Sequence, residues 1–178
     1  GKKYQVIQIG TVMTKEKYQK QGLASQLIEN IITDYQEKVD FIYLFANETV
    51  LDFYPKFGFR RYNELEFSIN PTQVTEKNVG ISAVNFYDHS INIEEKASQR
   101  NNSHLSTFLT NIEQLTMFYY STAFEELAFY IASLDTYVCY LINGTELHLL
   151  DILSEKNISI RKVLSYLPLE RINRIYFH

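Results

Sequence analysis

The chain lacks several features that mark specialised classes of protein. Its 178 residues include a single cysteine, Cys139, which excludes a disulfide within the chain. No apolar run reaches the roughly 20 residues that a membrane-spanning helix needs, and no signal peptide is visible, so we expect a cytoplasmic protein without a membrane partner. The formal net charge is −4 and charges of both signs are interspersed. Because there is no basic stripe, we expect no nucleic-acid partner.

The sequence also lacks a pattern of metal ligands. The four histidines are scattered, with no pair at metal-ligand spacing: His89, His104, His148 and His178. We therefore expect no metal site, and we place His148, which alternates with leucines, on the surface of a strand. Cys139 lies in an apolar run and is interpreted as a buried apolar residue rather than a nucleophile.

Apolar residues are plentiful. They make up 46% of the chain, and aromatic residues 15%, which is ample for a hydrophobic core and excludes a disordered protein. A chain of 178 residues fits one domain or one and a half.

The most informative segment spans residues 19–25, with the sequence QKQGLAS. Before it, residues 4–14 alternate apolar and polar side chains at the strand period. After it, apolar residues recur at helical spacing, at Leu23, Leu27, Ile28, Ile31 and Ile32. A strand, a glycine turn and a helix N-terminus point free backbone N–H groups and the positive end of the helix dipole at one place. We therefore expect an anion to bind there.

Two motifs resemble signatures of the GCN5-related N-acetyltransferase (GNAT) superfamily. The pattern Gln-x-x-Gly-x-Ala at 19–24 resembles its acetyl-CoA pyrophosphate loop, whose form is Arg/Gln-x-x-Gly-x-Gly/Ala. After the apolar run at 41–46, Asn47, Tyr54 and Gly58-Phe59 are in register with its second signature. The resemblance covers residues 4 to about 69, roughly the C-terminal half of such a domain. It implies an α/β (α+β) fold, a mixed sheet flanked by helices.

The resemblance implies acetyl-CoA as the cofactor and a role for each matching residue. Main-chain groups of Val12, Met13 and Thr14 would bond the pantetheine amides, because in this family the strand before the loop splays from its neighbour. Asn47 would bond the pantetheine arm. The loop would hold the pyrophosphate through Gln19, Lys20, Gln21, Gly22, Leu23, Ala24 and Ser25. The lysines at 15, 17 and 20 either support this site or form an ordinary solvated face.

The resemblance also implies that Tyr54 protonates the departing thiolate. A phenol can do this because its unperturbed pKa lies about 1.5 units above that of a thiol. Pro55 lacks an N–H, so the helix expected from Thr49 either breaks or restarts at Tyr54. A general base is not identifiable. Glu48 and Asp52 flank the tyrosine, and surface roles for both are the simpler interpretation.

Such a domain has further strands and helices before the pyrophosphate-binding element. The chain starts almost at that element, with Gly1 and no methionine before Met13. We therefore expect either a tag remnant at Gly1 or a fragment of a longer protein. The acceptor half of the domain cannot be read from this sequence.

The domains are predicted at 1–69 for the acetyl-CoA-binding half, 70–103 for a linker and irregular segment, and 104–178 for a second α+β unit. Helical spacing at Leu105, Phe108, Leu109, Ile112 and Leu115 predicts a helix. Strands are predicted at 127–131, 136–142 and 146–153, with an Asn143-Gly144 hairpin turn. A short helix at 160–167 and a strand at 172–177 follow.

Three interpretations of the second unit stay open. Its order resembles a degenerate GNAT-like unit that has lost the phosphate loop, because no glycine lies between Asp151 and Ile160. The second interpretation is an accessory α+β domain. The third is that the strands of this unit complete the sheet of the first part. We expect it to bind no second cofactor.

The sequence thus predicts an acetyl-CoA-dependent N-acetyltransferase that acts on a primary amine. The acceptor, a small molecule or a peptide, is not identified, and a homodimer is left open. One alternative is a non-catalytic acyl-CoA-binding or interaction module. A purely structural accessory protein would require both motifs to be coincidental.

Overall fold

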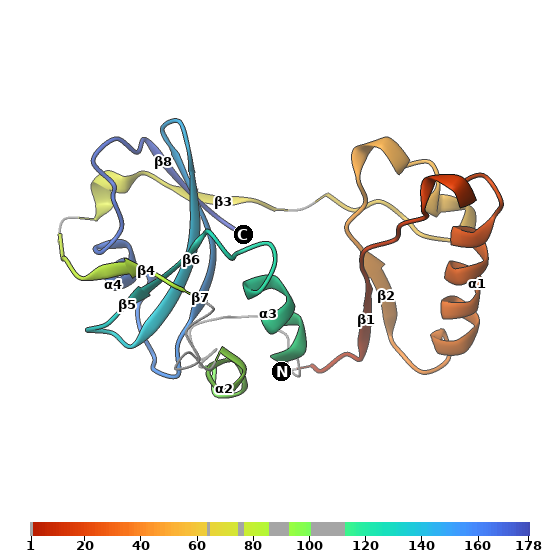
Figure 1. Ribbon diagram of the computed structural model, residues 1–178, viewed down its shortest axis with the longest axis horizontal. Helices are drawn as coiled ribbons and strands as arrows, with labels where there is room; N and C mark the ends of the chain where they lie inside the picture. Colours follow the sequence, from red (N-terminus) through yellow and green to blue (C-terminus); the bar gives the residue numbers. More distant parts are fainter. Residues whose placement is uncertain (1, 64, 75–76, 86–92, 101–112) are drawn as a thin grey trace. The chain divides into compact units, whose positions relative to one another are not determined.

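The computed structural model describes residues 2–63, 65–74, 77–85, 93–100 and 113–178. The chain folds into two compact units, Gly1–Glu64 and Leu65–His178. In Figure 1 the first is coloured red to orange and the second yellow to blue. Each unit has its own sheet.

The first unit is a βαβ arrangement. β1 (Val6–Ile9) and β2 (Phe41–Leu44) pair in parallel, and α1 (Leu23–Tyr35) connects them. Parallel neighbours need such a crossover because a tight turn cannot join them. Among the described residues of this unit, Ile9 and Ile28 are the buried apolar side chains, so the core is small.

Three short 3₁₀ helices complete the first unit. η1 (Glu16–Tyr18) precedes α1, and η2 (Glu48–Val50) and η3 (Tyr54–Phe57) follow β2. The helix predicted from Thr49 is therefore interrupted and restarts at Tyr54, which was one of the two outcomes expected from Pro55. Proline suits the first turn of η3, where its missing N–H would have no intrahelical partner.

A six-stranded mixed sheet, in the order β3-β8-β7-β6-β5-β4, forms the second unit (Figure 1). Its strands are β3 (Phe67–Ile69), β4 (Ile81–Ala83), β5 (Ala128–Ile131), β6 (Thr136–Asn143), β7 (Glu146–Leu153) and β8 (Arg174–Phe177). All neighbours are antiparallel except β7 and β8. The hairpin predicted at Asn143-Gly144 is confirmed, with the turn one residue later: Asn143 ends β6 and pairs with Glu146, and Gly144 (φ +60°) and Thr145 form the two-residue turn.

Two apolar cores lie against this sheet. α4 (Ile160–Leu164) supplies Val163 to a core that contains Val138 of β6. α2 (Ile93–Ser98) and α3 (Glu113–Tyr120) supply Ile93 and Tyr120 to a core that contains Cys139. Val138 and Cys139 belong to different cores because successive side chains of a strand point to opposite faces.

The second unit also contains a short 3₁₀ helix, η4 (Pro71–Gln73), which follows β3.

Ion pairs hold α2 and the residues after it against the second core. Lys96 Nζ lies 2.9 Å from Asp135 and 2.8 Å from Glu155. Burial would lower the pKa of Lys96, but its hydrogen bonds to Glu155 and Asp135 outweigh burial and raise it. Arg100 pairs with Asp151. Together these contacts fix a helix that has only a small apolar face.

The structure corrects several boundaries. The first unit ends at residue 64 rather than 69, because β3 pairs with β8 in the second sheet. The predicted linker at 70–103 contains β4 and α2, which belong to the second unit. The strand predicted over 4–14 is paired only over Val6–Ile9. The described strands of the second unit pair only with one another, so they do not complete the first sheet.

The predicted helix around Leu105, Phe108, Leu109 and Ile112 lies outside the described residues, as do His89 and His104. Leu115 falls within α3. The predicted strands at 127–131, 136–142 and 146–153 correspond to β5, β6 and β7, and the helix at 160–167 and strand at 172–177 correspond to the shorter α4 and β8.

Candidate functional site

The loop between β1 and α1 is shaped by residues with positive φ. Thr11 (φ +54°) turns the chain after β1, Lys20 (φ +61°) follows η1, and Gly22 (φ +78°) is the N-cap of α1. A left-handed conformation costs L-residues roughly 1–2 kcal/mol, and glycine adopts it without that cost. Gly22 therefore fits the turn that starts the helix.

At this turn the backbone offers unpaired donors. The N–H groups of Leu23, Ala24 and Ser25 form the first turn of α1, where a helix provides no acceptor. The first helical hydrogen bond runs from the backbone N–H of Gln26 to the Gly22 carbonyl, at 3.0 Å. Within the part of the chain that the structure describes, no acceptor meets the N–H groups of residues 20–25. This is the anion-binding geometry that the sequence predicted.

Two glutamine side chains of the loop form hydrogen bonds to its own backbone. Gln19 Nε2 donates to the Thr14 carbonyl at 3.2 Å, and Gln21 Nε2 donates to the Lys17 carbonyl at 3.3 Å. Each amide retains a second N–H. The sequence assigned both residues to the pyrophosphate, and the structure adds a role in holding the loop.

The surroundings of the loop are cationic. The side chains of Lys15, Lys17 and Lys20 are exposed. Lys17 Nζ lies 4.7 Å from the centre of the Tyr18 ring. No carboxylate among the described residues pairs with any of these lysines. Glu16 offsets part of this charge without pairing with a lysine, so the local net charge stays positive, which favours an anion.

The chain leaves the sheet before it reaches residues 12–14. The β1–β2 ladder ends with Ile9 opposite Leu44. Among described residues, no acceptor pairs with the N–H groups of Val12, Met13 or Thr14. The Met13 side chain is 82% exposed. The divergence of this strand from its neighbour, expected for the pantetheine contacts, is therefore present in the backbone.

Asn47 and Tyr54 lie on the segment after β2. Asn47 Oδ1 accepts from both the N–H and the hydroxyl of Thr49, each at 3.0 Å, and so caps η2. Its Nδ2 is left to donate elsewhere. The Tyr54 ring packs edge-to-face against Phe53, at 5.3 Å between centroids, and Phe59, at 6.1 Å. Both residues thus have a structural role besides the predicted one.

A broad cleft of about 1310 Å³ lies between β2, η3 and the segment 57–63. It exceeds the ~300–1,000 Å³ of ordinary ligand pockets, so it is an open groove rather than a closed cavity. Tyr54 lines it, but the loop residues 12–25 and Asn47 do not. Of the two candidate bases, Glu48 lines the groove and Asp52 does not, and both are exposed.

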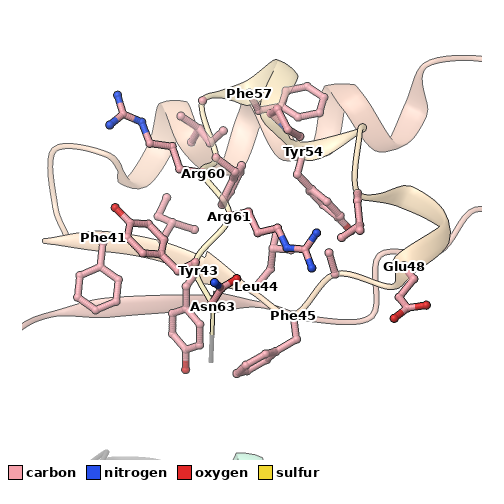
Figure 2. Close-up of a pocket in the computed structure, with 18 residues that line it drawn as sticks. Phe41, Tyr43, Leu44, Phe45, Glu48, Tyr54, Phe57, Arg60, Arg61 and Asn63 are labelled. Carbon is pink, nitrogen blue, oxygen red and sulfur yellow. The ribbon is translucent and has the colours of Figure 1, made fainter. Parts of the chain in front are cut away.

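Sequence reasoning missed two parts of this region. Arg60 and Arg61 line the groove and point in opposite directions in Figure 2. Phe41, Tyr43 and Phe45 project together on the side away from Tyr54 (Figure 2). The period-2 spacing of these rings was a visible signal, and Phe45 is 68% exposed.

Cys139, the single cysteine of the chain, is not accessible as a nucleophile. Cys139 is fully buried, as predicted, and burial raises the pKa of its thiol to about 12. No group of three or more metal-ligating side chains occurs in the described ranges. No described helix is both long and apolar enough to cross a bilayer.

Comparison with solved structures supports the fold. No curated protein sequence matches the chain, whereas 12 chains of known structure do. One is a conserved protein of unknown function from Enterococcus faecalis, described as a probable N-acyltransferase. It is 16% identical, with a TM-score of 0.54, and the match covers 98% of this chain and 47% of that one. This chain thus spans about half the length of that protein, and the similarity is one of fold.

Comparison with protein families gives a match in the first unit. Residues 1–62 match the family described as an acetyltransferase (GNAT) domain. The match includes the loop at 19–25, Asn47 and Tyr54, the residues from which the resemblance was inferred. Residues 1–62 of this chain are therefore similar to a GNAT acetyltransferase domain.

Proposed function

We propose that this chain carries the acetyl-CoA side of an N-acetyltransferase, which moves an acetyl group from a thioester to a primary amine. The observation that carries the proposal is the start of α1. There, unpaired N–H groups of residues 20–25 surround a glycine that has no atom within 4 Å of the place where a Cβ would be. A diphosphate carries the charge and the acceptor oxygens that this arrangement lacks.

The remaining contacts follow the backbone away from the loop. The unpaired N–H groups of Val12, Met13 and Thr14 can bond carbonyls of the pantetheine arm, as one strand edge bonds another. Asn47 Nδ2 can donate to the same arm, because the Oδ1 of that side chain already caps η2. Lys15, Lys17 and Lys20 add attraction for the phosphates.

In the chemical step, the amine nitrogen forms a bond to the thioester carbonyl carbon, and the carbon–sulfur bond breaks. We assign Tyr54 to protonate the leaving sulfur. No hydrogen bond from the Tyr54 hydroxyl is found among the described residues, so it can turn toward a thiolate. The packing of its ring on Phe53 and Phe59 limits the orientations it can take. The amine loses its proton to a base that the described residues do not identify.

The test compares Tyr54→Phe with Tyr35→Phe, a change at an exposed tyrosine at the end of α1. Release of CoA thiol would be followed with ethanolamine, lysine and spermidine as probe amines. We expect Tyr54→Phe to lower turnover by a factor of ~10² to 10⁴ while CoA affinity stays within about twofold. Tyr35→Phe should change neither. A Tyr54→Phe enzyme with the wild-type rate would remove Tyr54 from the mechanism.

The second candidate is a non-catalytic module that binds acyl-CoA. The exposure of both Glu48 and Asp52 favours it, because a carboxylate that accepts a proton from an amine usually needs a less solvated position. Tight CoA binding without turnover of any probe amine would make this the better proposal. A cytoplasmic location and an acceptor that is a small-molecule or peptide amine stay expectations from the sequence.

A further inference from the structure

His148 and His178 are brought together by the second sheet. They are 30 positions apart in the sequence, which is why no metal-ligand spacing was visible. β7 and β8 run side by side in parallel, with His148 opposite Tyr176. The backbone N–H of His178 donates to the Leu149 carbonyl at 3.1 Å and continues the ladder. The two imidazoles therefore project from neighbouring strands.

The side chains of this pair are close and ordered by their neighbours. His148 Nδ1 lies 2.9 Å from His178 Nε2, a hydrogen bond in which one ring donates to the other. The His148 ring stacks on Tyr176 at 5.0 Å and on His178 at 5.2 Å between centroids. The side chain of His148 is 22% exposed, so it is less open than the surface position predicted for it.

Glu146 occupies the other side of His148. Its Oε2 lies 4.0 Å from His148 Nε2, and its Oε1 accepts from the Tyr176 hydroxyl at 3.3 Å. A carboxylate near Nε2 favours the tautomer that carries its proton there, and this leaves a lone pair on Nδ1. The charged group on the facing strand, Arg174, donates to Ser68 instead.

We propose that His148 Nδ1 and His178 Nε2 form a two-histidine site for a divalent transition-metal ion. The ion replaces this hydrogen bond: the His178 proton moves through solvent from Nε2 to Nδ1, both rings stay neutral, and they tilt so that the lone pairs of His148 Nδ1 and His178 Nε2 meet on the metal. Water supplies the remaining ligands, since His178 is exposed. Glu146 orients His148 from the second coordination sphere and offsets part of the positive charge. The ion thereby links β7 to β8.

The separation of the nitrogens favours particular metals. Two nitrogens in adjacent positions of a square-planar or octahedral ion, each about 2.1 Å from it, are about 3.0 Å apart. A tetrahedral ion separates them by about 3.4 Å. The 2.9 Å hydrogen bond lies closer to the first separation, which Cu²⁺ and Ni²⁺ adopt, so these ions require a smaller shift of the two nitrogens than Zn²⁺ does. We expect affinity to fall in the order Cu²⁺, Ni²⁺, Zn²⁺, and Mg²⁺ not to bind.

The experiment titrates the full chain with CuCl₂, NiCl₂, ZnCl₂ and MgCl₂ by calorimetry, and records the electron paramagnetic resonance spectrum of the Cu²⁺ form. His148→Gln and His178→Gln should each lower Cu²⁺ affinity at least tenfold and remove the coupling from two nitrogens. His104→Gln, outside the described residues, is the matched control and should bind like the wild type. Circular dichroism without metal identifies any variant that fails to fold, and His178→Gln, at the exposed position, is the safer of the two. Absence of Cu²⁺ binding to the wild type, or equal affinity and spectra in wild type, His148→Gln and His178→Gln, would overturn the proposal.

Discussion

Replacing Gly22 by valine separates the anion-binding role of the loop from its backbone strain. In the free protein nothing lies within 4 Å of a Cβ placed on Gly22, so the Cβ of the new side chain has open space. Its cost is conformational, because φ is +78°. A left-handed residue costs roughly 1–2 kcal/mol, with β-branched residues at the upper end. We therefore expect a folded but less stable protein.

Binding should suffer separately from stability. The valine side chain would stand where a diphosphate must approach the N–H groups of residues 21–25. We expect CoA affinity to fall at least tenfold, which corresponds to about 1.4 kcal/mol. Calorimetric titration with CoA measures the affinity, and urea unfolding measures the stability.

Gly144 supplies the matched control. It also has a left-handed backbone, at φ +60°, also has nothing within 4 Å of a Cβ, and lies in the second unit. Gly144→Val should also lose stability but keep its CoA affinity. If Gly22→Val bound CoA as tightly as the wild type, the loop would have no part in binding. If both variants lost affinity equally, strain alone would explain the loss.

Further predictions concern the second unit. Because burial raises the pKa of the Cys139 thiol to about 12, iodoacetamide should label Cys139 only in denaturant, and fast labelling of the native protein would contradict this. Hydrogen bonds from Lys96 and Tyr130 lower the pKa of Asp135, so the folded state binds this proton less readily than the unfolded state. The stability that Asp135 provides should be present above about pH 4 and lost as pH falls through its lowered pKa. The urea unfolding midpoints of the wild type and of Asp135→Asn should therefore converge in that acidic range. An isolated 65–178 segment should gain no thermal stability from CoA, and a CoA-dependent shift would show a second site.

Local sequence signals predicted the parts of the fold that depend on local interactions. The Asn143-Gly144 pair and the alternation around it located β6 and β7, because a two-residue turn, here Gly144-Thr145, fixes both the pairing and the register. The spacing from Leu23 to Ile32 located α1, and the glycine before it located the N-terminus. The backbone geometry of the candidate site was predictable for the same reason, since its N–H donors belong to one continuous segment.

The missed features depend on partners far apart in the chain. β3 is three residues long and carries no periodic signal, and only its pairing with β8 assigns it to the second unit. α2 has few apolar residues, so its sequence shows no apolar stripe that would predict a helix. It is held instead by the ion pairs of Lys96 and of Arg100, which follows the helix. The contact between His148 and His178 exists only because β7 and β8 are neighbours.

The most direct test of the acetyl-CoA site is to add CoA to the ¹⁵N-labelled chain and follow its backbone amides by nuclear magnetic resonance. We predict that the largest shifts cluster on residues 20–25, whose N–H groups have no acceptor among the described residues, with smaller shifts at 12–14. Amides of the second unit should stay unchanged. Binding with shifts confined to other residues, or no shifts at millimolar CoA, would contradict the assignment of this loop as the acetyl-CoA site.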